Sequence, residues 1–77
     1  MKVVFKWFQF EVVAIFPELP YSNYSDLMTC YARIGQHSGC SKELLNFPNV
    51  EPDEYESLLN ELIQIGYNNL EIVNVQY

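Results

Sequence analysis

The sequence predicts a small α+β domain, in which an antiparallel sheet of order β-β-β-α-β carries one amphipathic helix packed on one face. Three observations support this prediction. The first half contains short runs rich in Val and aromatic residues, which are typical of strands. Residues 52–65 place apolar side chains near the 3.6-residue period of a helix. A chain of 77 residues is long enough for one modest core, so residues 1–77 are expected to form a single domain.

The first two strands are expected at residues 2–8 and 11–16. Only Gln9 and Phe10 separate these runs, so a hairpin is the simplest connection. The turn is unusual because it lacks the Gly, Asn and Asp residues that two-residue hairpin turns favour. A bulge or a longer turn is the alternative.

Prolines and loop-forming residues divide the middle of the chain. Pro17 and Pro20 are expected to end the second strand, because proline cannot donate a ladder hydrogen bond. Residues 21–26 are a loop by composition. Residues 27–34 alternate weakly and are interpreted as a third strand, with a short helix as the alternative. Residues 35–39, GQHSG, are expected to form a loop.

The helix is the clearest element. Pro52 can open it, because the amide hydrogen that proline lacks would be unpaired there, and Gly66 can end it in a left-handed conformation. Ser41 is expected to cap a short helical turn over residues 42–46. Residues 70–75 are expected to form the last strand, whose direction stays open. The apolar stripe of the helix is expected to contain Tyr55, Leu58, Leu59, Leu62 and Ile65.

The charge balance limits the classes of partner. Ten acidic residues against four basic ones give a formal net charge of -6, which argues against direct binding to nucleic-acid phosphates or to an anionic membrane surface. A partner protein with a basic surface would complement this charge. The simpler interpretation is that the acidity keeps a small protein soluble. No apolar run approaches a membrane span and no secretory signal is recognised, so the expected location is the cytoplasm.

Cys30, His37 and Cys40 are the only local cluster of reactive residue types. A structural zinc site usually needs four protein ligands, so no metal and no other cofactor are expected. A nucleophilic Cys–His pair is conceivable, but a hydrogen-bonding role for His37 is favoured, and the protein is not expected to be an enzyme. Both cysteines are expected to be reduced, with Cys30 buried in a strand and Cys40 more exposed in a loop.

Exposed acidic and aromatic side chains are the candidate binding residues. Acidic residues in the first turn of the helix favour its positive dipole end, and together with Glu61 they are expected to form one exposed negative face. Phe10, at the hairpin tip, has little core to reach. The alternative is that the acids only stabilise the helix and the aromatic residues only fill the core. The candidate binding residues are Phe10, His37, Asp53, Glu54, Glu56 and Glu61.

Three segments carry a resemblance to a known family: KVVFK followed by EVVAIFPE, the central Y-x-x-IGQH, and EY-x-x-L-x-x-EL-x-x-IGY followed by a strand. In these segments the chain resembles a family of small uncharacterised proteins of bacteriophages, prophages and other bacterial mobile elements. It departs from that family at Glu51, where Ser or Thr is frequent, and in a first hairpin turn that lacks Gly. The resemblance implies a mobile-element context, and with it the host bacterial cytoplasm as the location, and brings no catalytic residues.

Together these features favour a non-catalytic module that binds a host or phage protein with a basic surface, with inhibition of a host defence nuclease, CRISPR-type or other, as the specific hypothesis. The alternative is a homo-oligomeric accessory protein, such as a homodimer formed through a sheet edge or an aromatic patch. A third hypothesis is a metal- or thiol-dependent enzyme that uses Cys30, His37 and Cys40.

Overall fold

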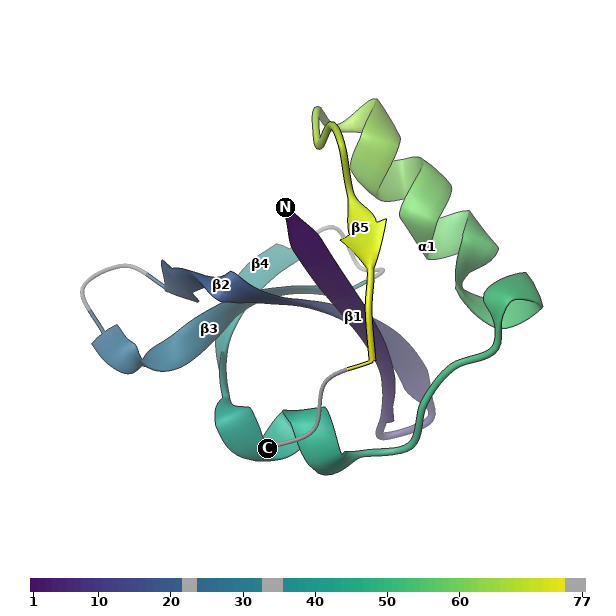
Figure 1. Ribbon diagram of the computed structural model, residues 1–77. Helices are drawn as coiled ribbons and strands as arrows, with labels where there is room; N and C mark the ends of the chain where they lie inside the picture. The colour runs from purple at the N-terminus through teal and green to yellow at the C-terminus, as the bar shows by residue number, and fades with distance from the viewer. Residues whose placement is uncertain (22–23, 33–35, 75–77) are drawn as a thin grey trace.

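The computed structural model contains one five-stranded sheet in the order β4-β3-β2-β1-β5, with one α-helix packed against it (Figure 1). It describes residues 1–21, 24–32 and 36–74. The predicted α+β class is therefore confirmed. The elements in chain order are β1 (Lys2–Phe8), β2 (Glu11–Tyr21), β3 (Tyr24–Ala32), β4 (Gln36–Ser41), the 3-10 helix η1 (Lys42–Asn46), α1 (Pro52–Gln64) and β5 (Glu71–Ile72).

The sheet is mostly antiparallel. Strands β1 to β4 form consecutive antiparallel pairs, and β5 then returns beside β1 in the parallel direction. The parallel pairing matches Lys2 with Glu71 and Val3 with Ile72. The direction of the last strand, which the sequence left open, is thus parallel to its neighbour. This strand is also shorter than the expected residues 70–75, of which residue 75 lies outside the described residues.

Side chains alternate between the two faces of the sheet along each strand, and both faces are covered. On one face, Val3 and Phe5 of β1 pack with Leu58 and Leu62 of α1. The Phe5 ring stacks on Tyr55 of α1 with the ring centroids 4.4 Å apart. Side chains on the other face form a second core cluster.

This second core lies under η1, which Figure 1 shows on a different side of the sheet from α1. Val4 of β1 packs there with Ile15 of β2 and Leu45 of η1. Lys6 is also buried, with 1 % of its surface exposed. Its ammonium donates a hydrogen bond of 2.5 Å to the Asn49 side-chain oxygen, and burial lowers the pKa of Lys6. This bond connects the segment after η1 to β1.

Strand β2 extends past its expected end. It continues to Tyr21 through both prolines, and its pairing with β3 shifts register between Phe16 and Pro20. Such an irregularity accommodates residues that cannot donate ladder hydrogen bonds, so Pro17 and Pro20 do not end the strand. The expected loop at 21–26 is wrong where it is described, since β3 already begins at Tyr24; residues 22–23 lie outside the described residues.

Strand β4 replaces the expected GQHSG loop, whose Gly35 lies outside the described residues. Gly and Ser have a low strand propensity, which explains the wrong prediction. Gly39 has a packing role: a Cβ atom there would lie 2.6 Å from Cδ2 of the Tyr21 ring. The absent side chain therefore makes room for an aromatic ring from β2.

The helix begins at Pro52 and ends at Gln64, close to its predicted bounds, and Gly66 has a φ of 120°. Ile65 follows the last helical residue and is 48 % exposed, so its expected place in the apolar stripe is wrong. The expected helical turn at 42–46 is confirmed as η1. Ser41 occupies its N-cap position but makes no side-chain cap hydrogen bond.

The predicted hairpin is confirmed, and its turn is strained. Gln9 and Phe10 have φ angles of 52° and 67°, in the left-handed region that two-residue hairpin turns require. For a residue other than glycine this conformation costs roughly 1–2 kcal/mol. The Phe10 side chain is 99 % exposed, so core packing does not offset that cost.

Replacing Phe10 with Gly is expected to raise the free energy of unfolding by about 1 kcal/mol, because glycine adopts a positive φ without steric cost. Urea denaturation of the wild type and of Phe10→Gly measures the difference. Phe10→Asn provides a second comparison, since Asn tolerates the left-handed region. A loss of stability in both variants would show that the Phe10 ring supports the fold.

Candidate functional site

The tip of the β1–β2 hairpin lies beside the start of α1, and the two elements enclose a cavity of about 250 Å³. The structure therefore brings together Phe10 and Glu54, two of the residues that the sequence singled out. Trp7 also contributes, although the sequence gave no specific reason to select it. We call this the hairpin–helix surface, defined by Trp7, Phe10, Glu11, Val12, Glu54 and Leu58.

Exposed acidic residues line the same cavity as Phe10 on the hairpin–helix surface. Glu11 follows Phe10 at the start of β2, and Glu54 comes from the first turn of α1; both are exposed. Asp53 and Glu56 are also exposed on α1, but they do not line the cavity. The arrangement presents an aromatic ring together with acidic groups, and it can accept a cationic side chain.

Glu61 is not part of this exposed acidic surface, contrary to the expectation of one negative face along the helix. It is half-buried, and its carboxylate accepts a hydrogen bond of 2.5 Å from the Tyr31 hydroxyl. Tyr31 comes from the inner strand β3 and is buried. The bond therefore connects α1 to the sheet beneath it.

His37 and Tyr67 extend this contact into a cluster. A ring nitrogen of His37 and the Tyr67 hydroxyl are 2.7 Å apart, and the His37 ring packs edge-on against Tyr31 with centroids 4.8 Å apart. The expected hydrogen-bonding role of His37 is confirmed, although the residue lies in β4 and not in a loop. The cluster connects β3, β4, α1 and the turn after α1, so its contacts hold the helix on the sheet.

The electrostatics of the cluster favour protonated phenols. The hydrogen bond to the Glu61 carboxylate raises the pKa of Tyr31, and burial raises the pKa of Tyr67. Both hydroxyls therefore stay protonated near pH 7 and can donate hydrogen bonds, which makes them weak nucleophiles. The cavity at the hairpin–helix surface is lined by other residues.

The expected cluster of Cys30, His37 and Cys40 does not form. His37 packs on the helix-covered face with Tyr31, whereas both cysteines belong to the core on the opposite face. Alternation along β4 causes this separation, because residues 37 and 40 differ by an odd number. A Cys–His nucleophile is therefore excluded for these residues.

The two cysteines instead lie close to one another. Both are free thiols with 6 % of their surface exposed, so the expected exposure of Cys40 is wrong. The Cys30 sulfur lies 3.2 Å from the Ser38 hydroxyl. Hydrogen bonds, first from the Cys40 thiol and then from Ser38, lower the pKa of Cys30, and the same contact with Cys30 raises the pKa of Cys40.

A cavity of about 560 Å³ opens onto these thiols. Its floor is formed by β2, β3 and β4, through residues that include Val13, Cys30 and Cys40. The apolar side chains of Phe8 and Leu44 also line this cavity, as does the exposed Glu11. Recognition of β4 and of its register with β3 would have placed the two cysteines on one face, since Cys40 shares a face with Ser38, which lies opposite Cys30.

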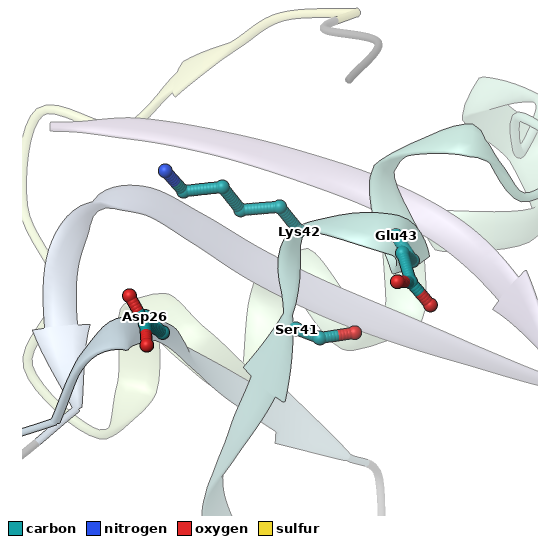
Figure 2. A pocket seen from close by; sticks show the side chains of 4 residues that line it. All are labelled: Asp26, Ser41, Lys42 and Glu43. Carbon is teal, nitrogen blue, oxygen red and sulfur yellow. The ribbon is translucent and has the colours of Figure 1, made fainter.

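A smaller hollow of about 230 Å³ lies where β3 begins and β4 passes into η1. Asp26, Ser41, Lys42 and Glu43 line it (Figure 2). The Lys42 side chain points away from the Glu43 carboxylate, so these polar groups do not converge on one point. The hollow therefore lacks the convergent polar groups that mark a binding pocket.

The described residues include no group of three or more His, Cys, Asp or Glu side chains that could hold a metal ion. Within the same residues, no helix is long and apolar enough to cross a membrane. Comparisons of the chain with protein-family models, with curated proteins and with solved structures give no match.

Replacing Tyr31 with Phe is expected to lower the midpoint of thermal unfolding at pH 7 by about 5–10 °C, because the partly buried Glu61 carboxylate loses its donor. The folded-state pKa of Tyr31 is raised, so its contribution to stability is present below pH 10 and is lost as the pH rises further. Thermal melts from pH 7 to 11 should therefore show a smaller alkaline loss in Tyr31→Phe than in the wild type. Equal alkaline slopes would contradict the role given to this hydrogen bond.

Proposed function

We propose that the protein is a small, acidic, non-catalytic module that binds a partner protein with a basic surface through its hairpin–helix surface. The observation that carries this proposal is Phe10, whose ring is 99 % exposed on a turn residue with a φ of 67°. A glycine there would relieve backbone strain, and the Phe10 ring is not part of either core cluster of the described residues. Strain that packing does not compensate is a feature of binding and functional sites.

The chemistry of the surface suits an arginine or lysine of the partner. A guanidinium can stack on the Phe10 or Trp7 ring and pair with a neighbouring carboxylate at the same time. Glu11 and Glu54 supply those carboxylates. Aromatic residues that become buried at the centre of an interface commonly contribute most of its binding energy.

The net charge of -6 supports the same class of partner. A negative field accelerates encounters with a basic surface and opposes contact with nucleic-acid phosphates or an anionic membrane. Proteins that bind nucleic acids carry basic grooves, so the specific form of the proposal is a host defence nuclease, CRISPR-type or other. The resemblance to mobile-element proteins is consistent with action in the cytoplasm of a bacterial host.

The proposal is tested by capture of partners from host lysate with tagged wild-type protein, followed by titration of the purified partner. Phe10→Gly is expected to weaken binding by about 30-fold, as for a central aromatic anchor. Glu54→Gln should weaken it less and should reduce the dependence of affinity on salt. Glu71→Gln, which removes an equal charge outside the hairpin–helix surface, is the matched control.

Two results would contradict this function. One is the absence of a specific basic partner and of any effect on the activity of a defence nuclease. The other is a partner that binds wild type and Phe10→Gly equally well, which would place the interface elsewhere on the molecule.

A second candidate function is homo-oligomerisation through β4. In the described part of the chain this strand lies at the edge of the sheet, next to β3. An edge strand presents backbone groups that can pair with a second copy of the chain. Light scattering after size-exclusion chromatography discriminates the two candidates: a dimer that Ser38→Pro abolishes, without loss of the fold, would support edge pairing, and a strict monomer at high concentration would remove it.

A further inference from the structure

Three sulfur-containing side chains gather on the face of the sheet opposite α1. Met28 and Cys30 are two residues apart on β3 and therefore share a face. Cys40 lies directly opposite Met28 on β4, while Cys30 lies opposite Ser38. All three belong to the same core cluster, with 5–6 % of their surface exposed.

We propose that Cys30 and Cys40, supported by the Met28 thioether, form a binding site for one soft monovalent metal cation of the Cu(I) type. Thiolate and thioether sulfurs are the ligands that Cu(I) prefers. The site differs from a zinc cluster because the thioether takes the place of imidazole or carboxylate. This inference is independent of the binding function proposed above.

The strand geometry favours a bridging ion over a disulfide. Cys30 and Cys40 are diagonal neighbours across β3 and β4, because Cys40 follows the residue opposite Cys30 by two positions. Diagonal neighbours are separated by roughly 7 Å, whereas a disulfide needs Cβ atoms about 4 Å apart. A metal atom between the sulfurs lengthens the connection and suits this spacing.

Zinc fits the site less well than Cu(I). A structural zinc ion takes four ligands in a tetrahedron, and its usual donors are thiolate, imidazole and carboxylate. His37, the single histidine of the sequence, lies on the opposite face of the sheet. Two thiolates can satisfy Cu(I), which accepts a low coordination number.

The cavity of about 560 Å³ provides an entry path, since both thiols line it. The Glu11 carboxylate, which also lines it, favours approach of a cation. The thiolate is the form of cysteine that ligates a metal ion. Binding releases the protons of both thiols to solvent, so that Cu⁺ and two thiols give a bis-thiolate complex and two H⁺.

The test is an anaerobic titration of the wild-type protein with Cu(I) in competition with a chromophoric Cu(I) chelator. One Cu(I) per chain is expected, with ultraviolet thiolate-to-metal absorbance and tighter binding than Zn(II) in a parallel titration. Cys30→Ser and Cys40→Ser should each weaken Cu(I) binding more than about 100-fold, beyond the loss typical of outer-shell changes. Met28→Leu should weaken it by a smaller factor, and Ser41→Ala, a sulfur-free change in the same cavity, should have no effect.

A measurement on the wild type alone covers the case in which the cysteine variants do not fold. Cu(I) should protect both thiols from alkylation by iodoacetamide, as counted by mass spectrometry of the intact protein. Alkylation of both thiols at the same rate with and without Cu(I) would overturn the proposal. So would undiminished Cu(I) binding by a folded cysteine variant, or tighter binding of Zn(II) than of Cu(I).

Discussion

The burial of β1 on both faces is the constraint on which the rest of the structure depends. Val3, Val4, Phe5 and Lys6 are each no more than 3 % exposed, although they alternate between the two faces. Full burial of one Val or Phe side chain stabilises a fold by roughly 1.5–3 kcal/mol, but only if the protein supplies cover on that side. In a chain of 77 residues, α1 covers one face and η1 with the segment after it covers the other.

This arrangement determines which surfaces remain for interaction. The covers are attached by specific polar contacts: Tyr31 holds Glu61 on one face, and Lys6 holds Asn49 on the other. Glu61 therefore serves the fold, and His37 does the same through its contacts with Tyr67 and Tyr31. The Phe10 side chain at the hairpin tip is 99 % exposed, so this residue can be strained without loss of the core.

The parts of the fold that depend on local pattern were predictable from the sequence. The helix, β1 and the two-residue hairpin follow from apolar periodicity, Pro52 and the short gap at Gln9 and Phe10. The errors occur where tertiary packing overrides local propensity. β2 passes through two prolines because a register irregularity accommodates them, and β4 contains Gly39 because the Tyr21 ring occupies the space of its side chain.

The candidate sites also divide into features that a local sequence pattern predicts and features that depend on tertiary structure. Phe10 was selected from its place at a hairpin tip, and the structure confirms its exposure and places it beside Glu54. The pairing of Cys30 with Cys40, and the separation of His37 from both, depend on the register of β3 with β4. That register could not be predicted while β4 was interpreted as a loop, because a loop does not fix which side chains share a face.

Amide hydrogen exchange, measured residue by residue by NMR, tests the central role of β1 most directly. The account predicts that the amides of Val3 to Lys6 and of their β2 partners Ala14 and Ile15 exchange slowest, at rates set by global unfolding. The hairpin turn and β5 should exchange much faster. Exchange in β1 as fast as in the hairpin turn would contradict the account, because the doubly covered strand would then open without unfolding of the molecule.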